Sequence, residues 1–333
     1  MPDVDLSTTA LGRQIASQPD ELTRLIEHPM PHVTVERLRQ AHRIWLVGTG
    51  TSQHAAELGA QMLHEAGRGA QAVGSMQFVK WAPPVGPRDA VILISHNAGT
   101  ETAYAGATWT MVMDAGVKVI PITKRGGDMP DALQTVERET SQTYTVSYTT
   151  ALLLLARLAA TLGATAFDDE TLRQVPEAVR AAIASPGIDE VARPARLLAI
   201  AGEGPSAVTA REGALKSREA ARVLAEGYDV EYLLHGNAVP LGRDDHLVVL
   251  TPPDTDGLVA AVARAAEAER VQVSRVREPA DLPPVLAQIP LVTRLQILAL
   301  RFALERGVDP DKVIVGAWDD EALWAIGSPG GRP

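Results

Sequence analysis

Three polar residues in the second half of the sequence have the types and spacing for proton transfer. Lys216 and Glu219 are three residues apart in a segment of helical spacing, which places them on one helix face. A carboxylate can remove a proton next to a carbonyl group and return it one carbon away. A neighbouring ammonium group can keep that carboxylate ionised or stabilise a developing oxyanion. His235 stands at a turn after an apolar approach and can exchange protons near neutral pH.

The same spacing also fits a helix surface that performs no chemistry. Glu212 and Lys216 at i,i+4, and Glu219 and Arg222 at i,i+3, match ordinary ion pairs worth roughly a few tenths of a kcal/mol each. His235 fits equally well as a buried histidine with satisfied hydrogen bonds. Spacing alone leaves both interpretations open.

Two loops in the first half combine glycine with small polar side chains. Each follows a short apolar run, at 44–47 and 90–94, that is typical of a buried parallel strand. At the carboxyl end of such a strand, backbone N–H groups and the positive end of the next helix favour an anion such as phosphate. A tight turn followed by a helix cap is the alternative. The candidate phosphate-binding residues are Gly50, Thr51 and Ser52 in the first loop, and Ser95, His96, Asn97 and Thr100 in the second.

Other ligand motifs are missing or broken, so we expect no cofactor and no metal. Gly48 and Gly50 lack the third glycine of a dinucleotide-binding loop, and no Gly-Lys-Ser or Gly-Lys-Thr is present for a nucleotide-binding P-loop. His28 and His32 are four apart, but the prolines between them exclude the helical face that a two-histidine metal site would use. The absence of cysteine excludes thiolate ligands and a cysteine nucleophile.

An internal repeat indicates how these residues are positioned. An offset of 154 residues aligns the run 44–47 with 198–201, each followed by Gly-x-Gly-x-Ser and then by small residues at helical spacing. The identities at this offset are Gly48/Gly202, Gly50/Gly204, Ser52/Ser206, Ala56/Ala210, Gly59/Gly213 and Ala60/Ala214. The repeated unit is therefore a strand, a loop and a helix.

The repeat predicts an α/β protein with two doubly wound parallel-sheet domains in tandem. Further apolar runs at 117–120 and 246–250 are expected strands. We expect a helical extension at 1–40, in which Leu22, Leu25 and Ile26 form one apolar face. The expected first domain is 41–166, the connection 167–194, and the second domain with its tail 195–333.

Composition limits the partners. The chain has 333 residues and a formal charge of −10, which argues against a nucleic acid or an anionic membrane surface as a partner. Arg157 interrupts the apolar run 151–166, which is too short to cross a bilayer and is expected to form a core helix. The N-terminus shows no secretory signal pattern, so we expect a cytoplasmic protein.

These motifs together resemble the sugar isomerase (SIS) domain family, over nearly the whole chain. The similarity is to the isomerase half of glutamine-dependent glucosamine-6-phosphate synthases and to stand-alone amino-sugar phosphate isomerases and deaminases. The motifs that carry it are Gly50-Thr51-Ser52-x-His54-Ala55, Ser95-x-Asn97-x-x-Thr100, Glu212-Gly213-Ala214-Leu215-Lys216-x-x-Glu219 and His235-Gly236.

The resemblance implies a tandem pair of SIS domains, commonly dimeric, that binds a hexose or amino-hexose 6-phosphate. By position, Ser52, Ser95, Asn97 and Thr100 would hold the phosphate. Glu219 would move a proton between C1 and C2, with Lys216 beside it. His235 would assist ring opening from the partner subunit. The implied activity is aldose–ketose isomerisation, with amino-sugar deamination as a variant.

Two of the departures from the family pattern bear on activity. Asn97 and Ala98 stand where the family usually has Ser-Gly, and Lys312 is the last lysine, whereas the synthases have a sugar-binding lysine close to the C-terminus. These departures favour an alternative, a non-catalytic phosphosugar-binding protein with a regulatory role. A transferase that takes ammonia from a separate partner is a third possibility.

Overall fold

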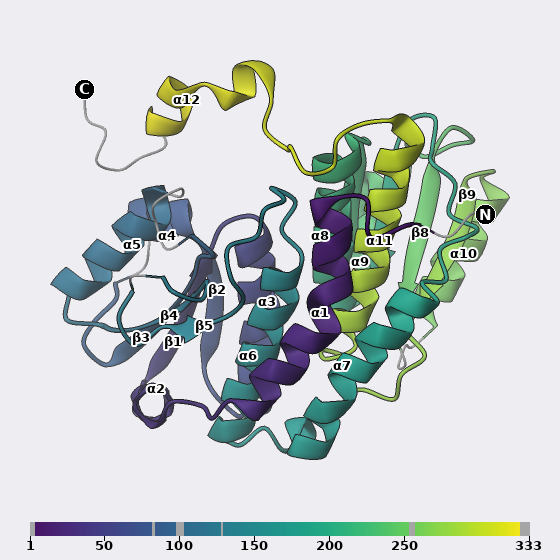
Figure 1. The fold of residues 1–333 in the computed structure, drawn as a ribbon. Helices are drawn as coiled ribbons and strands as arrows, with labels where there is room; N and C mark the ends of the chain where they lie inside the picture. Colours follow the sequence, from purple (N-terminus) through teal and green to yellow (C-terminus); the bar gives the residue numbers. More distant parts are fainter. Residues whose placement is uncertain (1–3, 82–83, 98–102, 128, 253–256, 327–333) are drawn as a thin grey trace. The chain divides into compact units, whose positions relative to one another are not determined.

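The structure is a computed structural model that describes residues 4–81, 84–97, 103–127, 129–252 and 257–326 (Figure 1). It divides into two compact units, each built around one parallel sheet. The five-stranded unit comprises Glu21–Glu139, Val146–Leu172 and Ile314–Pro333. The four-stranded unit comprises Met1–Asp20, Thr140–Thr145 and Arg173–Val313. Two long helices, α1 (Ala10–Glu27) and α7 (Asp169–Ala184), contribute residues to both units.

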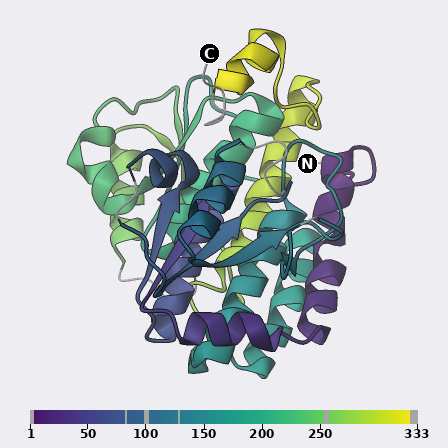
Figure 2. The same ribbon diagram turned by 90° about the vertical axis from the view of Figure 1, so that its left-hand side faces the viewer.

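The five-stranded unit alternates strands and helices along the chain (Figure 2). Its remaining elements are α2 (His32–Arg39), β1 (Arg43–Gly48), α3 (Thr51–Glu65), β2 (Ala70–Gly74), α4 (Ser75–Trp81), β3 (Asp89–Ile94), α5 (Ala103–Asp114), β4 (Lys118–Thr123), β5 (Leu133–Gln134), α6 (Val146–Leu162), η1 (Thr165–Phe167), η3 (Gly316–Asp319) and α12 (Glu321–Ile326).

The strand order in this sheet is β2-β1-β3-β4-β5, and all pairings are parallel. Alternate residues of β1 point to opposite faces. Trp45 belongs to a buried cluster with Phe78 of α4 and Val112 of α5. Leu46 lies against Gly59 of α3 on the other face. Helices therefore bury both faces of this sheet, which accounts for the continuous apolar character of β1 and β3.

The four-stranded unit repeats the pattern with one strand fewer. Its elements are β6 (Leu198–Gly202), α8 (Pro205–Ala221), β7 (Ala225–Asp229), α9 (Val230–Tyr232), the π-helical turn η2 (Leu233–Asn237), β8 (His246–Thr251), α10 (Leu258–Ala268), β9 (Gln272–Arg277) and α11 (Gln288–Arg306). The strand order is β7-β6-β8-β9, again with parallel pairing throughout.

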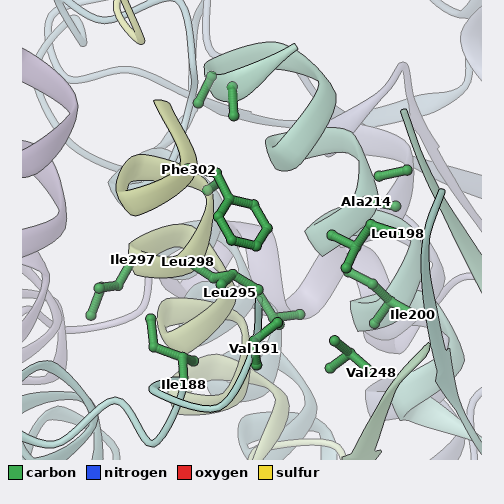
Figure 3. Close-up of a cluster of buried hydrophobic side chains, with 14 of the residues drawn as sticks. Ile188, Val191, Leu198, Ile200, Ala214, Val248, Leu295, Ile297, Leu298 and Phe302 are labelled. Carbon is green, nitrogen blue, oxygen red and sulfur yellow. The ribbon is translucent and has the colours of Figure 1, made fainter. Parts of the chain in front are cut away.

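Two buried clusters cover the two faces of this second sheet. Leu198 and Ile200 of β6 pack with Leu295 and Phe302 of α11 in one cluster, of which Figure 3 is a close-up. The alternate residue Ala199 belongs to the other cluster, with residues of α10. Helix α11 is buried along most of its length because it fills the space beside α8. The position and rotation of α8 are therefore fixed by a packed core.

The N-terminal part of α1 belongs to this unit. Leu11 and Ile15 are fully buried in the same cluster as α11. Asp311 accepts hydrogen bonds from the backbone N–H groups of Ala10 (2.8 Å) and Leu11 (2.7 Å), which caps the first turn of the helix. Of the residues on the predicted apolar face, Leu22 and Leu25 are buried and Ile26 is half-buried.

The structure confirms an α/β fold with two parallel sheets, and strands at each of the five apolar runs. The apolar run 151–166 falls largely in the buried helix α6, as predicted. No helix in the described ranges has the length and apolar character to cross a bilayer.

Candidate functional site

The first candidate loop joins β1 to α3 through a sharp turn. Gly50 has φ 57° and ψ −126°, a conformation that is strained for any residue with a side chain. Gly48 comes so close to the start of α3 that a Cβ atom there would lie 2.5 Å from the backbone of Ser52. The two glycines therefore allow the strand end to lie directly against the first turn of the helix, where Thr51 and Ser52 are half-buried.

The second candidate loop begins at the end of β3. Ser95 and Asn97 are both buried, each with 6% of its surface exposed. The Ser95 N–H donates to the carbonyl of Ile122 (3.0 Å), and the carbonyl of His96 accepts from the N–H of Lys124 (3.1 Å). The start of the loop is thus fixed against the end of β4. Thr100, the fourth candidate in this loop, lies outside the described residues.

Sheet topology brings the two loops to the same edge. β1 and β3 are neighbours in register, with Val47 opposite Leu93, so their loops leave side by side. The strand order also reverses between these strands, and ligands of open α/β sheets bind at such a switch point. Ser75, buried at the start of α4, adds a third hydroxyl group from the neighbouring strand end and is hydrogen-bonded to the Thr49 hydroxyl.

Ser75 was not identified from the sequence. It follows β2, whose residues are mostly half-buried and show no continuous apolar run. The sequence signal for such a residue is a small polar side chain directly after a predicted strand. Because β2 has no apolar pattern that predicts a strand, Ser75 could not be recognised as a strand-end residue.

The imidazole of His96 does not add positive charge to this edge. Burial is the main cause that lowers its pKa to about 4, and the positive charges of Lys124 and Arg138 lower it further. Near neutral pH the ring is uncharged.

The acidic cluster lies on α8 in the four-stranded unit. Lys216 is completely buried, and its Nζ atom lies 2.5 Å from Oε2 of Glu219 and 3.4 Å from Oε1 of Glu212. Glu212 is also completely buried, whereas the Glu219 side chain retains 20% exposure. The interpretation as a solvated surface pair is wrong for Glu212 and Lys216. Their i,i+4 spacing is the same on a buried face and on an exposed one, so only packing against α11 distinguishes the two.

Burial raises the pKa of Glu219, and the adjacent Lys216 opposes this effect. The ammonium group of Lys216 forms ion pairs with both Glu219 and Glu212. The negative charge of Glu212 also raises the pKa of Glu219. Glu219 is the partly exposed member of the cluster, so it is the carboxylate that an external molecule can reach. A carboxylate with a raised pKa is a stronger base.

His235 lies in the same unit but apart from this cluster. It is exposed on the turn η2, where Gly236 has φ 106°. No hydrogen bond or ion pair between described residues joins it to Lys216 or Glu219. The interpretation of His235 as a buried core histidine is wrong.

The loop after β6 repeats the backbone of the first candidate loop but not its chemistry. Gly204 has φ 52° and ψ −124°, close to the values at Gly50. Pro205 provides no N–H group there, and the Ser206 hydroxyl is buried and accepts a hydrogen bond from Gln288 (3.1 Å). The serine of the duplicated loop is thus engaged by a hydrogen bond within the protein.

The phosphate-loop candidates belong to the five-stranded unit, and Lys216, Glu219 and His235 belong to the four-stranded unit. Within the described ranges, no group of three or more histidine, aspartate or glutamate side chains is arranged to hold a metal ion.

Comparison with known proteins places these features in context. Residues 37–161 match the model of the SIS domain. A glutamine–fructose-6-phosphate aminotransferase (isomerizing) from Thermococcus kodakarensis is 28% identical over 310 residues, covering 83% of this chain and 52% of that protein. The enzyme of the same description from Streptococcus pneumoniae serotype 4 is 24% identical over 350 residues, covering 94% of this chain and 56% of that protein. The chain spans about half the length of these curated relatives.

Solved structures with the same fold cover almost the whole chain. A tagatose-6-phosphate ketose/aldose isomerase from Escherichia coli gives a TM-score of 0.80 at 18% identity, covering 95% of this chain and 99% of that one. A glucosamine-6-phosphate deaminase from Thermotoga maritima gives 0.76 at 20% identity, covering 92% of this chain and 97% of that one. At this level of identity the likeness concerns the fold.

Proposed function

We propose, from the SIS domain that this chain carries at residues 37–161, that the protein binds a hexose or amino-hexose 6-phosphate and interconverts its aldose and ketose forms. The observation that carries the proposal is the completely buried Lys216 paired with the partly exposed Glu219. Burying an ammonium group is costly, and two carboxylates held beside it form a preorganised acid–base site rather than a surface ion pair. The names of the relatives supply the substrate class, because they include fructose, tagatose and glucosamine 6-phosphates.

The phosphate group would bind at the edge where β1 and β3 end. Ser52, Ser95 and Asn97 would provide neutral donors there, together with the backbone of Gly50 and Thr51 and the side chain of Thr100. Neutral donors suit this protein, whose net charge of −10 offers little long-range attraction for a dianion. At this edge the phosphate would anchor the sugar to the protein.

Glu219 would act as the base on the open-chain sugar. Its carboxylate removes the proton from C2 of the aldose, the C2–H electron pair forms the C1=C2 double bond, and the carbonyl oxygen takes up the displaced pair. A proton passes from the C2 hydroxyl to the C1 oxygen, and Glu219 then returns the carbon-bound proton to C1 while an electron pair on the C2 oxygen forms the ketose carbonyl. Lys216 would stabilise the negative charge that develops, and positioned proton transfer of this kind accelerates a reaction by roughly 10²- to 10⁴-fold.

His235 would open the sugar ring by proton transfer, and we propose that it does so in the partner subunit of a homodimer. Its exposure and its exposed apolar neighbours support this role, because they provide a surface for a second copy. These neighbours are Tyr232 (66% exposed), Leu234 (52%) and Val239 (85%).

Amino-sugar deamination is a variant of the same proposal, because the same proton transfer in a 2-amino sugar leaves an imine at C2, which water hydrolyses to the ketose and ammonia. The second candidate function, non-catalytic phosphosugar binding, is favoured by Asn97 in the second loop, where the family usually has a serine. Both candidates share the phosphate loops and differ in what Glu219 does.

We also propose the domain division expected from the sequence, with doubly wound SIS domains at 41–166 and 195–333 in a cytoplasmic protein that binds no nucleic acid. The alternation of β6 residues between two buried clusters supports the doubly wound arrangement.

Hydrogen exchange tests the function directly. Glucosamine 6-phosphate, fructose 6-phosphate and tagatose 6-phosphate are incubated with the protein in deuterated water, and deuterium at C1 or C2 is followed by NMR. We expect exchange with at least one sugar even where net conversion is small. Tight binding of these sugars without exchange would select the non-catalytic candidate.

A further inference from the structure

Two hydrogen bonds, one at the His96 ring and one at the Glu139 side chain, connect the start of the second phosphate loop to the N-terminus of α6. The Nε2 atom of His96 lies 3.2 Å from the backbone nitrogen of Glu139, whose N–H donates to it. The side chain of Glu139 is buried, and its Oε1 accepts a hydrogen bond from the N–H of Ser147 (2.8 Å). His96 and Glu139 thus link the loop after β3 to the first turn of α6. All of these residues belong to the five-stranded unit.

This geometry fixes the tautomer of His96. A backbone N–H group can only donate, so the Nε2 atom that faces it must carry no proton. In a neutral ring the proton is then on Nδ1. A second proton on Nε2 would point at the N–H of Glu139 and break the bond.

The surroundings favour the same neutral state. Lys124 at the end of β4 and Arg138 beside Glu139 both disfavour a positive charge on His96, and burial acts in the same direction. The Glu139 carboxylate accepts a hydrogen bond from the Ser147 N–H at the start of α6. The carbonyl of His96 is also fixed, by the Lys124 N–H and by the Thr123 hydroxyl (3.0 Å).

We infer that His96 is a positioning residue, a neutral Nδ1–H imidazole that holds Ser95 and Asn97 in place by hydrogen-bonding the backbone of Glu139. Its tautomer and its link to Glu139 follow from the geometry alone, whereas its effect on phosphate rests on the proposed function. The sequence places His96 among the candidate phosphate-binding residues, and the inference assigns it a positioning role beside them.

The tautomer is tested by long-range ¹H–¹⁵N NMR of the imidazole rings in the full chain, with the His96→Gln variant used to assign the signal among the eight histidines. We expect an Nδ1-protonated ring at pH 7 that does not titrate between pH 8 and pH 5. A ring protonated at Nε2, or a titration near pH 6.5, would overturn the inference. This result does not depend on any sugar.

The positioning role is tested by calorimetric titration with inorganic phosphate and with glucosamine 6-phosphate. His96→Leu removes the acceptor at Nε2 and with it the link to the Glu139 N–H, so we expect binding about tenfold weaker. His96→Gln supplies a carbonyl acceptor and should bind within about threefold of the original protein. The exposed His28 provides a matched control, and His28→Leu should bind unchanged.

Equal affinity in the His96→Leu and His96→Gln variants would contradict the positioning role. If the unmodified protein binds neither phosphate nor the sugar, the proposed function fails as well. The tautomer measurement then shows whether the link to Glu139 exists, so the two failures are distinguishable.

Discussion

The ammonium group of Lys216 lies 2.5 Å from a carboxylate oxygen of Glu219, one turn further along α8, and no part of the lysine side chain reaches solvent. Glu212 approaches the same ammonium group from the preceding turn, at 3.4 Å. The buried ammonium group of Lys216 is therefore the ion-pair partner of both carboxylates. Substitutions in this cluster should change the free energy of unfolding, and substitutions of Glu219 should also slow the proposed proton transfer.

Replacing Lys216 with methionine should strongly destabilise the protein. The variant loses the ammonium group beside two carboxylates, of which Glu212 is completely buried, and breaking a buried pair in this way costs about 3–5 kcal/mol. Urea denaturation at pH 7 measures the loss. Arg275→Met provides the control, because Arg275 and Glu267 form a pair with 35% and 46% exposed side chains, and such a surface pair contributes about 0–1 kcal/mol. Equal losses in the two variants would mean that the Lys216 cluster is no more than a surface pair.

The pH dependence of stability should reveal the raised pKa of Glu219. In the folded protein its pKa lies above the ordinary value of 4.5, so the folded state binds the proton more tightly than the unfolded state. The stabilising contribution is complete below pH 4.5 and is lost as the pH rises through the pKa of the folded state. The free energy of unfolding should therefore fall with rising pH relative to Glu219→Gln, which cannot ionise. Parallel curves for the two proteins between pH 4 and pH 8 would exclude the raised pKa.

Gly50→Ala and Gly204→Ala form a matched pair, because both glycines have nearly the same φ and ψ and neither has an atom within 4 Å of an added Cβ. Backbone strain should cost each variant about 1–3 kcal/mol in free energy of unfolding. Only Gly50→Ala should also weaken binding of glucosamine 6-phosphate, since in the loop at Gly204 the proline at 205 offers no N–H group and the Ser206 hydroxyl is hydrogen-bonded to Gln288. If both variants lose affinity equally, the phosphate does not bind specifically at the loop after β1.

A mixing experiment tests whether His235 acts in the partner subunit. Glu219→Gln and His235→Ala should each be inactive alone, whereas a mixed dimer would contain one site with an intact glutamate and an intact histidine. Random exchange of subunits should then restore about a quarter of the original activity. Activity that stays at the level of the single variants after subunit exchange would place His235 and Glu219 in the same subunit's site, and full activity of His235→Ala alone would remove His235 from the reaction.

The sequence predicted the parts of the fold that have a strong local pattern. The repeat around Gly48 and Gly202 predicted two related strand–loop–helix units, and Gly50 and Gly204 indeed share one backbone conformation. The central strands β1, β3, β6 and β8 were identified because helices bury both of their faces, which requires continuous apolar runs. The edge strands β2 and β7 were missed because they contain half-buried and exposed residues.

Residues that acquire a role through distant contacts could not be predicted. Glu212 has the spacing of a surface pair, and its burial is due to packing against α11, which lies far along the chain. The tautomer of His96 is set by the backbone of Glu139, which is 43 residues away and has no local signature near the loop. Ser75 lies at the same sheet edge only because of the strand order.

The most direct test of the central claim compares the original protein with Glu219→Gln in deuterated water, using the phosphosugar that gives the fastest exchange at C1 or C2. Glu267→Gln on α10 serves as the control, because it makes the same chemical change at an exposed site. We predict that Glu219→Gln binds the sugar within about threefold of the original affinity but exchanges hydrogen at least roughly 10²-fold more slowly. Exchange at the original rate in Glu219→Gln would contradict the assignment of this carboxylate as the base.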